Sequence, residues 1–242
     1  MDGREDYLAN LSKARLGDAK AMYNVGICYQ SGIGVEIDID RSIEWYEMSA
    51  EHGFDEALIL LEGIFSGCKG FVLQFDIDHS RFINISKYIK CVELGCKKGY
   101  PISLYDKGNI HRDGLGDYKK SLKEAVLCWL KVIEMDFNWA YNFEKNNRTP
   151  FGVYERLSAT YAIINSYHNL GISYFHGSCD LLKDIDKAIY YLGEAAILGN
   201  MKSASDLIDI YLEGKGVPID EKKAEYWMKI RRENGKPILG VY

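Results

Sequence analysis

The sequence predicts an all-α protein in which about five helix-turn-helix repeats stack into a solenoid behind an N-terminal capping helix. Glycine is frequent (23 of 242 residues) and proline is scarce (4), which indicates many short helices joined by tight turns. Proline interrupts helices, whereas glycine just past a helix end lets the chain turn. A common set of residue types also recurs along the chain, and such a period is the sequence signature of repeat architectures.

The first 18 residues are expected to cap the stack. A helical pattern runs from Asp6 to Leu16, and residues 9–17 reproduce the end of a second repeat helix. Each repeat that follows is read as a first helix (helix A), a turn and a second helix (helix B). Helix A carries glycine at Gly26 in the first repeat and at Gly171 in the fourth, where it costs roughly 1 kcal/mol relative to alanine. Such a cost is understandable where the partner helix must approach closely.

Capping and closing residues mark each helix B. An Asp or Ser at its start can accept hydrogen bonds from the free N–H groups of the first turn. Fifteen residues later stands a closing position, usually glycine, which takes a positive φ past the helix end. The pairs are Asp38 and Gly53, Ser80 and Gly95, Ser121 and Asp136, Asp184 and Gly199, and Asp220 and Gly235. Five equal intervals indicate a genuine repeat.

These marks predict one continuous domain over residues 1–242, because no repeat buries its apolar stripe without its neighbours. Its parts are a cap (1–18), repeats (19–54, 55–100, 101–137, 166–199 and 200–235), an insertion (138–165) and a tail (236–242). Within the insertion we expect a loop from Asn142 to Gly152 and a helix from Tyr154 to Ile164. Residues 67–79 replace the short turn of repeat two. Long loops in compact folds are often functional.

The residue pattern of the repeats resembles a known family. The fifth repeat shows it as Leu207, Tyr211, Gly214-Lys215-Gly216-Val217, Asp220, Lys223-Ala224, Trp227 and Gly235. This order resembles the Sel-one-like repeat family, which is related to the tetratricopeptide repeats, and the resemblance covers roughly residues 19–137 and 166–235. It implies a right-handed α/α superhelical solenoid that mediates contacts between proteins and is not an enzyme.

Charge and composition exclude several classes of partner. The net charge of −5 argues against a nucleic-acid partner, which needs clustered Lys and Arg. No apolar run approaches the ~20 residues of a membrane span, and the N-terminus lacks the features of a secretory signal. We therefore expect a cytoplasmic protein with no membrane partner. Its six cysteines contain no CxxC pair and are expected to be reduced thiols.

The sequence shows no motif for catalysis or for a cofactor. It has no phosphate-binding loop, no metal-binding His or Cys signature and no nucleophile elbow, so no cofactor and no metal are expected. His111 stands at the aromatic position of repeat three and is read as a packed histidine. His168, His176 and Cys179 lie near one another in the sequence, and a metal-dependent regulator or enzyme built on them is an alternative that no spacing rule supports.

A binding surface is predicted on the concave side, where each repeat presents its helix A. If the tetratricopeptide register carries over, the partner-binding residues are Tyr23, Ile27, Gln30, Ile59, Tyr105, Asn109, Arg112, His168, Ile172, Phe175, Asp209 and Leu212. The alternative is that Tyr23, Ile27, Ile172 and Phe175 are ordinary packing residues. If exposed, they would form an apolar and polar groove that holds a protein segment.

The resulting hypothesis is a non-enzymatic scaffold that binds a protein partner through this face and the inserted segments. Short bacterial members of the resembled family without a signal peptide include immunity proteins that neutralise a toxin. Size, acidity and two atypical segments favour that role here, with a one-to-one complex. The alternative is a regulatory or host-facing adaptor that brings several proteins together.

Overall fold

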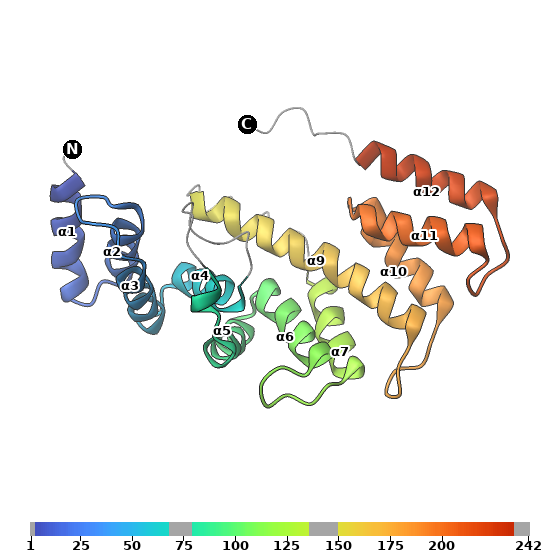
Figure 1. Ribbon diagram of the computed structural model, residues 1–242, viewed down its shortest axis with the longest axis horizontal. Coiled ribbons are helices and arrows are strands. Elements are labelled where there is room, and N and C mark those ends of the chain that lie inside the picture. Colours follow the sequence, from blue (N-terminus) through green and yellow to red (C-terminus); the bar gives the residue numbers. More distant parts are fainter. Residues whose placement is uncertain (1–2, 68–78, 136–149, 235–242) are drawn as a thin grey trace. The chain divides into compact units, whose positions relative to one another are not determined.

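The computed structural model describes residues 3–67, 79–135 and 150–234. Within these residues the secondary structure comprises eleven α-helices and one short 3-10 helix, with no strand (Figure 1). The all-α prediction is therefore confirmed. No described helix is long and apolar enough to cross a membrane.

The chain divides into two compact units, Met1–Lys98 and Gly99–Tyr242. Unit 1 contains α1 (Gly3–Arg15), α2 (Ala19–Ser31), α3 (Ile39–Glu51), α4 (Asp55–Ser66), the 3-10 helix η1 (His79–Phe82) and α5 (Ile85–Lys98). Unit 2 contains α6 (Pro101–Asp113), α7 (Leu122–Ile133), α9 (Pro150–His176), α10 (Ile185–Ile197), α11 (Met201–Glu213) and α12 (Glu221–Asn234). That the repeats form one continuous stack through residue 98 stays a prediction.

The predicted capping residues lie at the starts of four helices B. Asp38, Ser121 and Asp184 accept hydrogen bonds from the backbone N–H three residues further on, and these bonds begin α3, α7 and α10. Asp220 does the same from Lys223 N at 3.0 Å, at the start of α12. Each bond satisfies one N–H group that has no partner inside its helix.

A second contact links each cap to the preceding helix A. In every repeat the backbone N–H of the capping residue donates to the carbonyl of the aromatic residue near the end of helix A. The pairs, at 2.8–3.0 Å, are Asp38 with Tyr29, Asn84 with Phe65, Ser121 with His111, Asp184 with Tyr174, and Asp220 with Tyr211. This bond fixes how helix B leaves the turn, and it places His111 at the aromatic position, as predicted.

In repeat two the structure corrects the predicted register by one helical turn. The cap of α5 is Asn84, whose side chain accepts from Lys87 N at 3.0 Å, and not Ser80, which lies in η1. The residue with positive φ after α5 is Gly99 (φ 82°), whereas Gly95 is buried inside the helix. The interval of fifteen residues holds, but it runs from Asn84 to Gly99.

Close approach between paired helices explains the glycines inside helix A. A Cβ on Gly26 would lie 2.6 Å from the ring of Tyr46, and a Cβ on Gly171 would lie 2.6 Å from Leu192 Cγ. Both distances are far below van der Waals contact. The glycines therefore let α2 and α3, and likewise α9 and α10, pack with their backbones close together.

The helix predicted within the insertion continues without a break into helix A of repeat four. Together they form α9, which packs against α6, α7 and α10 (Figure 1). The predicted loop ends earlier than expected, because residues 150–152 already belong to α9. The rest of that loop, residues 142–149, lies outside the described residues. The same holds for residues 68–78 of the other atypical segment.

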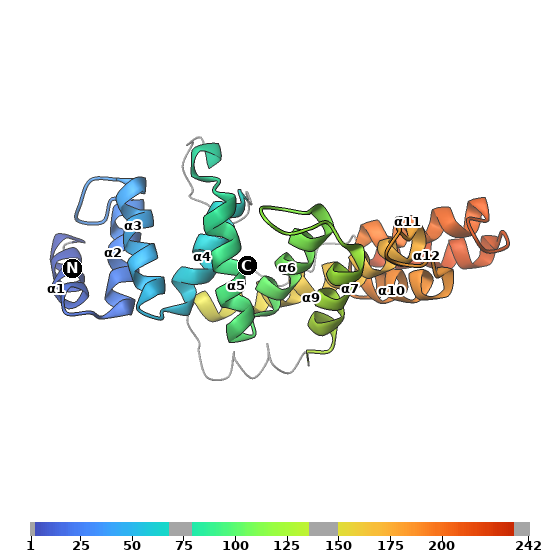
Figure 2. The same cartoon turned by 90° about the horizontal axis from the view of Figure 1, so that it is seen from below.

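Each unit has its own apolar core. One cluster in unit 1 centres on Val25 and Tyr29, with Trp45 packed at its edge. In unit 2, α10, α11 and α12 lie side by side (Figure 2) and share a cluster around Leu192 and Leu207, against which Trp227 packs. These two tryptophans are half-buried at the edges of their clusters, and Trp129 on α7 is fully buried.

Candidate protein-binding site

In unit 2, side chains on adjacent helices A bond to one another. Asn169 Nδ2 on α9 donates to Asn109 Oδ1 on α6 at 3.3 Å. His168 Nδ1 on α9 lies 2.8 Å from Ser203 Oγ on α11. Two of the predicted partner-binding positions, Asn109 and His168, therefore contribute to packing between neighbouring repeats.

His168 is a buried, neutral histidine. Only 7% of its surface is exposed, and burial lowers its pKa to about 4. Asp206 Oδ2 lies 3.8 Å from its Nδ1, and burial raises the pKa of that carboxyl group. Within the described part of the chain, no three His, Cys, Asp or Glu side chains are grouped so that they could hold a metal ion. His168 thus has a structural partner in Ser203.

The predicted partner-binding residues differ in how far they reach the surface. Buried are Ile59, Tyr105 and His168; half-buried are Tyr23, Ile27, Gln30, Asn109, Arg112, Ile172 and Phe175; exposed are Asp209 and Leu212. The three buried residues are not available to a partner in this structure. The other nine, three in unit 1 and six in unit 2, reach the surface, and we call these positions in each unit its helix-A surface.

Packing explains much of the helix-A surface in unit 1. The ring of Tyr23 lies 5.3 Å from that of Tyr46 and 5.2 Å from that of Phe54, measured between centroids. Gln30 Oε1 accepts a hydrogen bond from the Tyr46 hydroxyl. In unit 2, Ile172 and Phe175 pack at the edge of the core, but Asp209 and Leu212 on α11 project into solvent.

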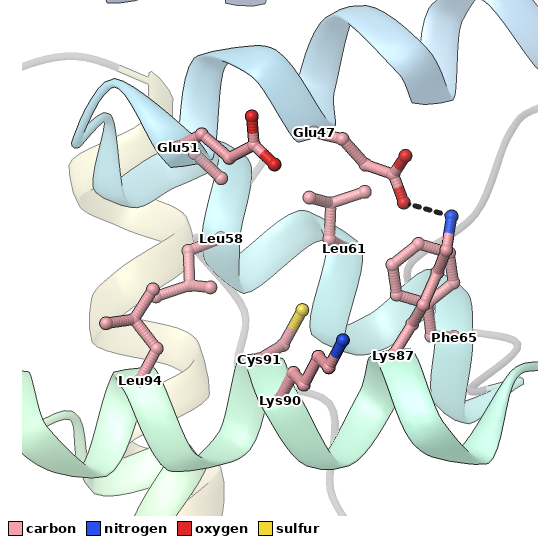
Figure 3. Close-up of a pocket in the computed structure, with 10 residues that line it drawn as sticks. Glu47, Glu51, Leu58, Leu61, Phe65, Lys87, Lys90, Cys91 and Leu94 are labelled. Atoms are coloured by element: carbon pink, nitrogen blue, oxygen red, sulfur yellow. Dashed lines mark hydrogen bonds and ion pairs between the residues drawn. The ribbon is translucent and has the colours of Figure 1, made fainter.

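A groove that the sequence did not predict lies in unit 1 (Figure 3). It has a volume of about 300 Å³ and lies between α3, α4 and α5. We call it the α4 groove; its lining residues are Glu47, Ala50, Glu51, Leu58, Leu61, Phe65, Lys87, Lys90, Cys91 and Leu94. The side chains contributed by α4 are all apolar.

Charged residues form the two walls of the α4 groove. Figure 3 shows Glu47 and Glu51 on the α3 side and Lys87 and Lys90 on the α5 side. Lys87 forms an ion pair with Glu47, and its Nζ lies 5.2 Å from the ring centroid of Phe65. Within the described residues neither Glu51 nor Lys90 has an ion-pair partner. One acidic and one basic side chain are therefore available at the edges of an apolar slot.

The cysteine in the α4 groove is chemically unreactive. Burial, followed by the nearby carboxylates of Glu62 and Glu47, raises the pKa of Cys91 to about 12. A thiol with this pKa stays protonated near neutral pH, and the nucleophilic form is the thiolate. The groove thus offers apolar surface and no nucleophile.

The corrected register aligns Cys91 of the α4 groove with one position in each of the other repeats. Cys91 stands seven residues after its cap, and the same position holds Trp45, Tyr191 and Trp227 in repeats one, four and five, and Cys128 in repeat three. In repeat four, the Tyr191 ring stacks on Tyr174 with centroids 5.8 Å apart. Tyr174 is the counterpart of Phe65. Where repeat four places an aromatic ring, repeat two has only a small thiol.

Stacked helix pairs with exposed surfaces on their outer sides define an α-solenoid scaffold, a class of protein that binds other proteins. The Sel1 repeat family model matches residues 19–54, 101–137, 164–200 and 205–230, more than half of the chain. The chain therefore belongs to the Sel1 repeat family, whose members bind protein partners. The matched segments leave out residues 55–100, the repeat with the shifted register.

Comparison with known proteins gives distant relatives. The chain is 23% identical over 175 residues to cytochrome c oxidase assembly factor 7A of Xenopus laevis, covering 66% of this chain and 74% of that protein. A Sel1 repeat protein from Oxalobacter formigenes aligns with a TM-score of 0.59 at 22% identity, over 96% of this chain and 80% of its own, and shows the fold. An immunity protein from Pseudomonas aeruginosa aligns with a TM-score of 0.44 at 13% identity, over 94% and 72%.

Proposed function

We propose that the chain is a non-enzymatic scaffold that binds one protein partner through its helix-A surface in unit 2. The observation that carries this proposal is the mixture of side chains there. Ile172 and Phe175 are half-buried on α9, and Asp209 and Leu212 are exposed on α11. Apolar groups that remain accessible beside polar ones are typical of protein-binding sites.

We further propose that the partner is a bacterial toxin and that the chain neutralises it as an immunity protein. The net charge of −5 and the exposed Asp209 support a partner with a basic surface. Charge complementarity of this kind accelerates encounter and excludes partners of the wrong charge. An acidic scaffold bound over the basic cleft of a toxin would block access to its substrate.

The test is co-expression with a toxin encoded by a neighbouring gene. The wild-type chain should protect the cells and form a one-to-one complex, whereas Phe175→Glu and Asp209→Lys should lose both. Leu127→Glu is a matched control, because Leu127 is 45% exposed on α7, a helix that carries none of these residues. Absence of protection and of a complex would refute the toxin proposal, and weak binding of several proteins would favour the adaptor.

A further inference from the structure

We propose that the α4 groove is a second protein-binding site, and that it receives the apolar face of an amphipathic helix. This inference goes beyond the proposed function, since it concerns other residues, which all lie in unit 1. It also stands independently of the toxin proposal, because it can be tested with purified protein and a synthetic peptide.

The shape of the groove favours the insertion of a partner's side chains rather than its main chain. Leu58, Leu61 and Phe65 at its floor are each no more than 4% exposed, so a partner side chain reaches the groove mainly along its rim, where Leu94 is 39% exposed. Its volume of about 300 Å³ arises at the position where repeats one, four and five place a Trp or Tyr ring. A slot of this kind fits one or two large apolar side chains of a partner.

The floor also has the spacing of a helix. Leu58, Leu61 and Phe65 stand at positions i, i+3 and i+7 of α4 and span about 10 Å along its axis. Apolar residues at i, i+3 or i+4, and i+7 of a partner helix span the same distance. A helix lying over the slot can therefore place one or two anchors in it at once.

Backbone hydrogen bonding decides between a helix and an extended segment. An extended segment brings N–H and C=O groups that need partners when they are buried. The walls of the groove, α3 and α5, are helices whose own backbone groups are bonded internally, so they offer no sheet edge. A helical segment satisfies its own backbone groups and needs only side-chain contacts.

The two walls determine the charges that the helix should carry. On the α3 wall Glu51 is available to a basic residue, and on the α5 wall Lys90 is available to an acidic residue. The complementary helix therefore has its apolar face flanked by Lys or Arg on one side and by Asp or Glu on the other. A helix with two basic or two acidic flanks would meet repulsion at one wall.

The probe is a fluorescein-labelled helical peptide of about 18 residues, long enough to span the ~10 Å floor with a turn to spare at each end. It carries leucines on one face, lysines on one flank and glutamates on the other. We expect it to bind about tenfold more tightly than versions with two lysine flanks, two glutamate flanks, or serines replacing the leucines. Equal affinity for all four peptides, or no binding, would overturn the proposal.

Three variants assign the binding to the groove. Cys91→Trp fills the slot with the residue that repeats one and five use, and Leu94→Glu places a charge on its 39% exposed edge; each should weaken binding about tenfold or more. Lys90→Glu leaves Glu51 and the introduced glutamate as the available charges of the two walls, because Lys87 stays paired with Glu47, and should shift the preference to the peptide with two lysine flanks. Leu8→Glu, on α1 of the same unit and 51% exposed, should change nothing. Unchanged binding by Leu94→Glu would place the peptide elsewhere and refute the site.

Discussion

Gly108 on α6 offers a direct test of how closely the paired helices pack. A Cβ at this position would lie 2.3 Å from Trp129 Nε1 and 2.6 Å from Trp129 Cδ1. The indole cannot move aside easily, because it is fully buried and its Nε1 donates to Tyr105 O at 3.2 Å. Alanine gains about 1 kcal/mol in helix propensity, but forcing α6 and α7 apart costs about 1–3 kcal/mol and weakens this hydrogen bond.

We therefore expect Gly108→Ala to lower the free energy of unfolding by about 1–2 kcal/mol, the overlap outweighing the propensity gain. Gly193→Ala in α10 is the matched control. There the nearest atom to a Cβ is Trp227 Cη2 at 3.3 Å, on a half-buried ring that can shift slightly. This variant should be neutral or up to about 1 kcal/mol more stable. Urea unfolding followed by far-UV circular dichroism measures both. Equal shifts of the same sign would refute the reasoning.

Three further predictions concern caps and titrating groups. Asp180 accepts hydrogen bonds from Ser178 and Ser121, which lower its pKa to about 2. The lowered pKa stabilises the folded state fully above the unfolded pKa of ~3.9, and this contribution is lost as the pH falls to about 2. Wild type and Asp180→Ala should therefore converge in acid unfolding at that pH. Burial lowers the pKa of His168 to about 4, so the folded state should lose stability as the pH falls from ~6.5 to 4. Urea unfolding at pH 7 and at pH 5 measures this loss, which should be smaller in His168→Gln. Asn84→Ala removes the cap of α5 and should cost about 1 kcal/mol by the same assay; no loss would contradict the corrected register.

The sequence was sufficient to predict the elements whose signals are local. Asp38, Ser121, Asp184 and Asp220 cap their helices because the interaction needs only a short polar side chain and the N–H groups of the next turn. Repeat two could not be assigned in this way. Nineteen residues separate Phe65 from its cap, instead of nine or ten in the other repeats. Both Ser80 and Asn84 are suitable capping types, and only the folded structure shows that Asn84 is the residue whose N–H donates to Phe65 O.

The candidate sites were harder to predict, because exposure depends on the neighbouring repeat. His168 stands at a position that the helix register places on the concave side, yet Ser203 of the next repeat covers it. Tyr105 is covered in part by the ring of Tyr161 at 5.8 Å, from the first half of α9. Neither contact follows from the residues of one repeat alone. The α4 groove was missed for a related reason: with Ser80 as the cap, Cys91 does not align with Trp45.

The conserved contacts within the repeats explain why one position can vary in size. In four repeats a cation three residues after the cap lies over the helix-A aromatic ring, at 5.1–5.7 Å from its centroid: Arg41 over Tyr29, Lys87 over Phe65, Lys187 over Tyr174, and Lys223 over Tyr211. With the bond from the cap N–H to the aromatic carbonyl, this contact fixes the start of helix B whatever side chain follows one turn later. The residue there can then be a large ring that closes the space between helices or a thiol that leaves it open. In repeat two, where the residue is Cys91, that space is the α4 groove.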